Sequence, residues 1–191
     1  MMPSDSVLQA HNDRHGDGWM SPFRGKGRQR GGAADLLRRG SIALRKRRLD
    51  EAIELLEAAV ASDEQSAAGH VNLGTAYYLS ERHSQAVGQF EAAVKLKPKD
   101  PAPLLNLAAA HNALGHMDKA MAVLEQLRAH QPTHRNLNFN LAVAYHRQGR
   151  VQDAVTALQR ELKLHPGSKH AASMLQQIAG EIAERAVRSR R

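Results

Sequence analysis

Residues 73–98 read LGTAYYLSERHSQAVGQFEAAVKLKP, and the spacing of a few positions within them decides the fold. The informative positions are Leu73-Gly74, Tyr77, Ala86, Phe90, Ala93 and Pro98. The same places recur further on as Leu107-Ala108, His111, Ala120, Leu124, Leu127 and Pro132. After another equal interval they hold Leu141-Ala142, Tyr145, Ala154, Leu158, Glu161 and Pro166, and a weaker upstream copy has Gly40, Ala43, Ala52, Leu56 and Ala59. The interval is about 34 residues each time, and a fixed period of this length predicts a repeat architecture.

This pattern resembles the tetratricopeptide repeat, a helix–turn–helix unit with Leu-Gly, Tyr, Ala, Phe and Pro at fixed offsets. The resemblance implies an all-α fold, a right-handed superhelical solenoid of about four repeats with a C-terminal capping helix. The repeats occupy 33–66, 67–100, 101–134 and 135–168. One helical pair cannot bury its apolar face alone, so stacked neighbours must bury it together.

The pattern also predicts where each helix begins and ends. First helices lie near 34–46, 67–80, 101–114 and 135–148, and second helices near 50–62, 83–97, 117–130 and 151–165. Gly115 and Gly149 lie at the turn inside their repeats, where positive φ ends a helix cheaply. Arg47 and Glu81 occupy the same place, so their turns are less favourable.

The two ends of the chain have other predicted roles. Residues 169–191 predict an amphipathic capping helix over 169–187 and a basic tail, with one apolar side formed by Ala172, Leu175, Ile178, Ala179, Ile182 and Ala186. Residues 1–32 predict a disordered, Gly-rich basic arm without periodicity. Within the arm, Trp19, Met20 and Phe23 either dock into a groove or contact nothing.

The amino-acid composition limits which cellular compartment and which kinds of chemical site are expected. The chain has 191 residues and no Cys, which excludes disulfides and thiolate metal sites and fits a reducing compartment. No apolar run approaches the ~20 residues of a membrane span, and the N-terminus lacks a secretory apolar region. A cytoplasmic location is therefore expected. The net charge of +8 is concentrated towards the two ends of the chain rather than spread along the repeats.

Neither catalysis nor a cofactor is expected. The sequence lacks a P-loop, a Gly-x-Gly-x-x-Gly after a strand and a nucleophile elbow. The 11 His residues include pairs at His11/His15 and His130/His134, but the first pair lies in the arm and Pro132 separates the second. No metal site is therefore expected, and His111, in the place of the motif Tyr, is expected to be a packed core imidazole.

The strongest functional signal is an absence of charge from the first helices. Windows 66–80, 101–115 and 136–146 contain no Asp, Glu, Lys or Arg. At about 100° per residue, places two, six, nine and thirteen of each repeat lie opposite the apolar stripe. These places hold Ala68, Asn72, Thr75 and Leu79, then Ala102, Asn106, Ala109 and Ala113, then Asn136, Asn140, Val143 and Arg147. The resemblance implies that first helices line a concave groove, so this face would be the groove.

An asparagine recurs at the sixth place as Asn72, Asn106 and Asn140. A side-chain amide can pair with a peptide C=O and N–H together, so stacked amides could hold an extended backbone. The row resembles the asparagine ladder of O-GlcNAc transferase. The alternative is that Asn at this place reflects the consensus of the family or local capping.

Charged residues could provide two other binding modes. Chaperone-binding members of the family hold a C-terminal carboxylate with Lys, Asn and Arg, but the corresponding places here are Leu37, Ser41, Ala102 and Asn106, and only Asn72 matches. The densest cationic cluster, Arg38–Arg48, either pairs with the acids downstream or forms a basic lip with Arg38 at one end of the groove.

The leading functional prediction is a non-enzymatic scaffold or adaptor that binds an extended, largely uncharged peptide along the groove. One alternative is a nucleic-acid or ribonucleoprotein-associated factor that uses the basic arm and the Arg-rich C-terminus. Another is a self-assembling structural scaffold.

Overall fold

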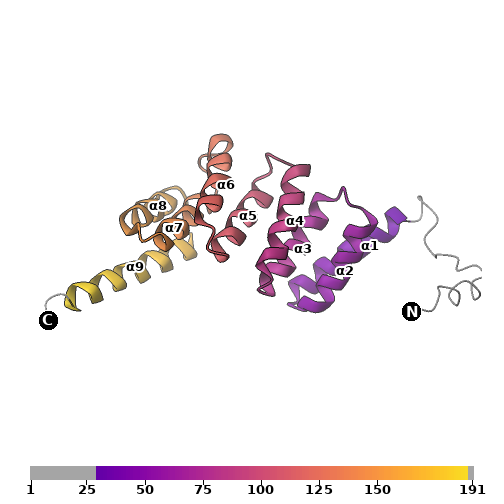
Figure 1. Ribbon diagram of the computed structural model, residues 1–191, viewed down its shortest axis with the longest axis horizontal. Coiled ribbons are helices and arrows are strands. Elements are labelled where there is room, and N and C mark those ends of the chain that lie inside the picture. Colours follow the sequence, from indigo (N-terminus) through magenta and orange to yellow (C-terminus); the bar gives the residue numbers. More distant parts are fainter. Residues whose placement is uncertain (1–28, 189–191) are drawn as a thin grey trace, which may run out of the picture.

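The computed structural model describes residues 29–188, and that range folds into nine helices without a strand (Figure 1). The first helices of the pairs are α1 (Gln29–Arg45), α3 (Ala67–Leu79), α5 (Pro101–Ala113) and α7 (Leu137–Arg147). The second helices are α2 (Leu49–Ser62), α4 (His83–Leu96), α6 (Met117–His130) and α8 (Val151–Leu164), and α9 (Lys169–Arg188) follows. The predicted all-α helical repeat fold is confirmed. The arm over 1–28 and the tail beyond Arg188 lie outside the described residues.

One residue in left-handed conformation ends each first helix. The φ angles are 60° at Arg47, 61° at Glu81, 79° at Gly115 and 75° at Gly149. In the second pair the N–H of Arg82 donates to the carbonyl of Tyr77 at 2.9 Å, and that of Glu81 to Tyr78 at 3.1 Å. These two bonds form a Schellman motif, which satisfies carbonyls left open at a helix C-terminus. The predicted role of the turn glycines is confirmed.

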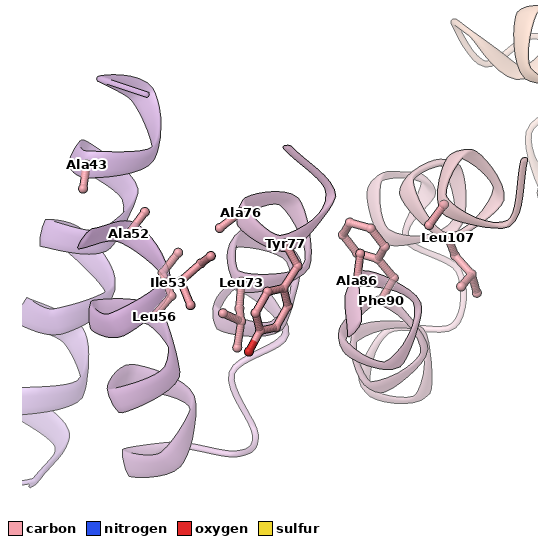
Figure 2. Packing of buried hydrophobic residues seen from close by; sticks show 11 residues of the cluster. Ala43, Ala52, Ile53, Leu56, Leu73, Ala76, Tyr77, Ala86, Phe90 and Leu107 are labelled. Carbon is pink, nitrogen blue, oxygen red and sulfur yellow. The ribbon is translucent and has the colours of Figure 1, made fainter. Parts of the chain in front are cut away.

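Small residues let the two helices of a pair approach closely. A Cβ on Gly74 would lie 2.6 Å from the Phe90 ring, and one on Gly40 would lie 2.6 Å from Leu56. Ala86, Ala120 and Ala154 are fully buried at the matching place on the second helices. Figure 2 shows the resulting core, in which residues from the first two repeats form one cluster with Leu107 and Ala110 of the third.

Two helices begin elsewhere than predicted. Helix α1 begins at Gln29, so residues 29–32 are helical although the sequence assigned them to the arm. Extending an existing helix costs only one residue's conformational freedom for each added hydrogen bond. Helix α7 begins at Leu137 rather than 135, because Asn136 has φ 68° and donates its N–H to the Glu161 carboxylate at 2.7 Å.

Helix α9 covers the end of the stack with a narrower side than the sequence predicted. Ala171 and Ile178 are buried against α8, and Met174 and Leu175 are half-buried. Four of the six predicted apolar positions are instead exposed, namely Ala172, Ala179, Ile182 and Ala186. Helix α8 covers only one edge of this apolar side, and residues 182–188 are all exposed.

Candidate functional site

The first helices line the inner side of the array. Helix α3 contacts both α1 and α5, and α5 also contacts α7, whereas no comparable contacts join successive second helices in the described residues. In a curved stack, the elements on the inside of the curve approach one another most closely. The uncharged positions on α3, α5 and α7 therefore belong to the helices on this side.

We use the term inner face for seven uncharged residues of the predicted groove on these three helices. All seven are half-buried, and they are Asn72, Thr75, Leu79, Asn106, Ala109, Asn140 and Val143. Half-burial keeps one side of each residue accessible while its neighbours restrict the side chain. Within α3, α5 and α7 no Asp, Glu or Lys occurs, and the single Arg is Arg147 at the end of α7.

The three asparagines of the predicted row differ in their hydrogen bonds. Asn72 donates from Nδ2 to the Ser41 hydroxyl of α1 at 2.9 Å. Asn140 donates from Nδ2 to the carbonyl of Asn136, one turn earlier in the chain, at 2.9 Å. Asn106 makes no side-chain hydrogen bond with any described residue, so its whole amide is available to a ligand. Asn72 and Asn140 each keep the amide oxygen and the second N–H of Nδ2 without a partner among the described residues.

Arg147 and Arg38, the cationic residues predicted for the groove, have partners in their own chain. The Arg147 guanidinium reaches back to α5 and donates to the carbonyls of Asn112 and, at 3.5 Å, Ala113. A cation at this place interacts favourably with the negative, C-terminal end of the α5 dipole. Arg38 is exposed and pairs at 2.7 Å with Asp35, three residues upstream, rather than with the acids downstream of the cluster.

An apolar row beside the inner face was missed in the sequence. Leu37, Val71, Leu105 and Phe139 each stand at the fifth place of their repeat, and all are half-buried. On a helix this place adjoins the second and ninth places, which belong to the predicted groove. The recurrence of an apolar residue at one place of every repeat was the signal that would have identified the row. It makes this side of the array apolar as well as uncharged.

A pocket lies at the N-terminal end of this apolar row. Its volume is about 340 Å³, and it is lined by Ala33, Ala34, Leu37, Ala59, Asp63 and Ser66. These residues come from the start of α1, the end of α2 and the residue that caps α3. The pocket is large enough for an apolar side chain and carries one carboxylate at its edge.

His111, at the place of the motif Tyr, is buried in the core. His111 is 5% exposed and lies 5.9 Å, ring to ring, from His116. Burial lowers the pKa of His111, with a smaller effect in the same direction from Lys119 and an opposing one from Glu91. His111 is thus the packed core imidazole that the sequence predicted. Across 29–188, no three His, Asp or Glu residues gather as metal ligands would.

No helix within residues 29–188 is both long enough and apolar enough to cross a bilayer.

The comparison with known protein families identifies one family. Family models of the tetratricopeptide repeat match residues 37–101, 80–136 and 120–178. No curated protein matches the sequence significantly. Three solved structures illustrate the likeness in fold.

MamA from Desulfovibrio magneticus RS-1 has a TM-score of 0.68 and 18% identity, and the match covers 83% of this chain and 90% of that one. The tetratricopeptide protein TTC0263 from Thermus thermophilus has a TM-score of 0.67 and 22% identity, with 77% and 81% covered. The first such domain of Spaghetti (RPAP3), bound to the HSP90 peptide SRMEEVD, has a TM-score of 0.56 and 20% identity, with 63% and 96% covered. At identities of 18% to 22%, these three matches show a shared fold and nothing more.

Proposed function

Because the chain belongs to the tetratricopeptide repeat family, we propose that it is a non-enzymatic scaffold or adaptor that binds an extended, largely uncharged peptide segment. The peptide lies along the inner face, and protein or peptide binding is the general role of this family. The lack of Cys fits a cytoplasmic site of action.

The observation that carries the proposal is the uncharged, half-buried inner face of three successive first helices. A helix surface that faced only water would normally carry charged residues. Here it carries amides and small or apolar side chains beside the row Val71, Leu105 and Phe139. Such a surface favours a ligand that offers backbone amides and apolar side chains and has few charges to desolvate.

A solved neighbour supports peptide binding but not the same chemistry of recognition. The Spaghetti (RPAP3) domain is bound to the acidic peptide SRMEEVD. In the present chain the places that hold a C-terminal carboxylate in chaperone-binding members carry Leu37, Ser41 and Ala102. We therefore propose that this chain reads the peptide backbone and apolar side chains rather than a terminal carboxylate.

The test begins with a library of random peptides displayed on phage and selected on the full chain. We expect the enriched sequences to be depleted in Asp, Glu, Lys and Arg, because the inner face has no charge that would compensate for burying theirs. Calorimetry on one enriched peptide should then show little change of affinity with salt, since there is little charge to screen.

Variants at Asn106 locate the site without disturbing the fold, because its amide has no partner in the described chain. Asn106→Ala should weaken peptide binding by about 0.5–1.5 kcal/mol, the typical net value of one hydrogen bond. The control is Gln126→Ala on α6, whose exposed amide bonds only the Pro98 carbonyl among the described residues. Equal binding by wild type and Asn106→Ala, or selection of acidic peptides, would contradict the proposal.

The nucleic-acid alternative has one specific observation in its favour. Arg45, Lys46, Arg47 and Arg48 are all exposed at the α1–α2 turn, and of these only Arg48 has an ion-pair partner among residues 29–188, Glu51 at 3.3 Å. Phosphate contacts would make affinity fall steeply with salt. A steep salt dependence of binding to single-stranded RNA, abolished by replacing Arg45 and Lys46, would favour this alternative.

A further inference from the structure

The pocket of the first repeat lies where α1 and α2 form the N-terminal end of the array (Figure 1). Its volume is about 340 Å³, and its lining is apolar except for Asp63 and Ser66. Ser66 already accepts a hydrogen bond as the cap of α3, so Asp63 is the polar group left for an occupant. At the place of Ala59 the third repeat carries Leu127, which is buried, and the smaller Ala59 side chain fills less space.

The rim of this pocket is acidic. Asp63 and Glu64 are exposed, and neither forms an ion pair with another residue of the described chain. The cations of α1 in this region, Arg38 and Arg39, are paired with Asp35 at 2.7 and 3.8 Å. The acid is particular to the first repeat, because the place of Asp63 holds other residues in the later ones, namely Lys97, Gln131 and His165.

The end of α2 beside the pocket also lacks a cation of its own. The last turn of α2 contains no basic residue, whereas the last turns of α4, α6 and α8 each contain at least one. A positive charge near a helix C-terminus interacts favourably with the negative end of the helix dipole. The pocket therefore favours an occupant that is apolar at its centre and cationic beside it.

The chain carries a segment of this chemistry directly before α1. Trp19 is the only Trp, and residues 20–28 after it contain three cations, Arg24, Lys26 and Arg28, and no acid. An indole has a large apolar body and one N–H donor, which needs an acceptor when the ring is buried. The pocket offers an apolar lining and Asp63, whose Oδ1 accepts the Gln65 N–H while Oδ2 has no partner among the described residues.

We propose that Trp19, which lies outside the described residues, binds in this pocket of its own chain. The indole N–H donates to the Asp63 carboxylate, and the cations of residues 24–28 lie beside Asp63, Glu64 and the end of α2. Gln29 follows Trp19 by ten residues, which span at most about 33–36 Å when extended. Ala33 lies four residues further along α1, or about 6 Å, so the segment can turn back and still reach.

The covalent link favours this segment over a free partner of similar composition. A short flexible tether gives an effective concentration on the order of 1 mM, so a contact with a dissociation constant of about 0.1 mM would be occupied in about nine chains of ten. Pro22, Gly25 and Gly27 lie between Trp19 and α1, and such residues suit a chain reversal.

A docked Trp19 would cover Leu37, which is both a lining residue of the pocket and the first member of the apolar row. The segment would then compete with a peptide at that end of the inner face. This consequence rests on the proposed function, whereas the docking itself does not. The test therefore observes Trp19 directly and uses no peptide.

Because the chain has a single Trp, its fluorescence reports on Trp19 alone. We expect the folded full chain to emit at shorter wavelength than the same chain unfolded in urea. Quenching by acrylamide should be several-fold weaker in the folded chain, since most molecules hold the indole in the pocket. This protection should not depend on protein concentration, because the contact is within one chain.

Two variants remove the site with residues that the chain carries at the same places of other repeats. Ala59→Leu fills the pocket as the third repeat does, and Asp63→Lys installs the lysine of the second repeat. Each should restore most of the quenching seen in urea. The control Glu91→Lys makes the same change of charge at an exposed position of α4 and should leave Trp19 protected. Circular dichroism checks that all three variants keep their helix content.

Three results would overturn the proposal. The first is equal quenching of the folded and the unfolded chain, which would mean that Trp19 is exposed. The second is protection that persists in both Ala59→Leu and Asp63→Lys, which would mean that Trp19 is buried elsewhere. The third is protection that appears only as the protein concentration rises, which would assign the contact to a second copy.

Discussion

At the turn inside each helical pair, one residue must adopt positive φ, between 60° and 79°, yet two of the four are not glycine. Glu81 is exposed and makes no side-chain hydrogen bond with any described residue, so nothing there offsets the strain of its Cβ. The left-handed conformation costs a non-glycine residue roughly 1–2 kcal/mol. Glycine avoids this cost but loses more freedom on folding.

We therefore expect Glu81→Gly to raise the free energy of unfolding by about 0.5–1 kcal/mol, the difference between these two effects. Urea denaturation followed by circular dichroism measures it. Glu81→Ala, which removes the charge but keeps the Cβ, should bring no such gain. If both variants were equally stabilised, the charge rather than the backbone conformation would be the cause.

The third repeat replaces a ring–cation pair with two imidazoles. Arg82 lies over the Tyr77 ring and Arg150 over the Tyr145 ring, each at 4.5 Å, whereas His111 and His116 occupy the matching places at 5.9 Å. Burial lowers the pKa of His111 below its usual 6.5, so the folded chain holds fewer protons there than the unfolded chain. His111 therefore contributes to the free energy of unfolding above pH 6.5, and this contribution is lost as the pH falls below that value.

The free energy of unfolding, measured by urea denaturation, should therefore fall as the pH drops from above 6.5 to well below it. His111 should account for part of this fall. The double variant His111→Tyr/His116→Arg, which installs the pair of the neighbouring repeats, should flatten that dependence. A variant with the same pH profile as the wild type would show that the pair does not contribute.

Among the helices, α7 owes its start to a carboxylate on another helix. Glu161 of α8 is fully buried, and its Oε1 accepts the Asn136 N–H at 2.7 Å at the start of α7. Asn136 itself provides no side-chain cap. The other repeats have Ala59, Ala93 or Leu127 at this place, and α3 and α5 are capped instead by Ser66 and Asp100.

Glu161→Ala should lower the free energy of unfolding by about 2–4 kcal/mol, because a buried N–H loses its acceptor and a cavity remains. Glu161→Gln keeps an acceptor of the same shape and should cost less. Chemical denaturation of the two variants side by side tests the difference. If both variants lost the same free energy of unfolding, the difference in side-chain volume and the hydrogen-bond acceptor at residue 161 would not matter for the stability of α7.

Over the whole molecule, each repeat is stabilised by its neighbours, and α9 is the neighbour of the last pair. Ala171 and Ile178 complete the cluster formed with Ala142, Ala154 and Leu158. Removing residues 169–191 should expose that cluster, lose about 3–5 kcal/mol of apolar burial and lower Tm by roughly 10 °C. Differential scanning calorimetry measures the shift, and an unchanged Tm would show that α9 is not a structural cap.

The repeat length, the helical pairs and the turn positions could all be predicted from the amino-acid sequence. These follow from local spacing, because each helix needs only its own periodicity and a residue of positive φ to end it. Gly74, Gly115 and Pro98 could therefore be interpreted without knowledge of any contact. The same spacing carries the resemblance to the tetratricopeptide repeat, and the family models confirm that resemblance.

Which side chains of the inner face are free to bind a ligand could not be predicted, because it depends on how the repeats stack. Asn72 bonds Ser41 of the preceding repeat, Arg147 bonds carbonyls about one repeat earlier, and Asn106 bonds no described residue through its side chain. The same holds for α9, whose apolar side is covered only as far as α8 reaches. Periodicity assigns a residue to a face of a helix, but the stacking of neighbouring repeats determines whether another element fills that face.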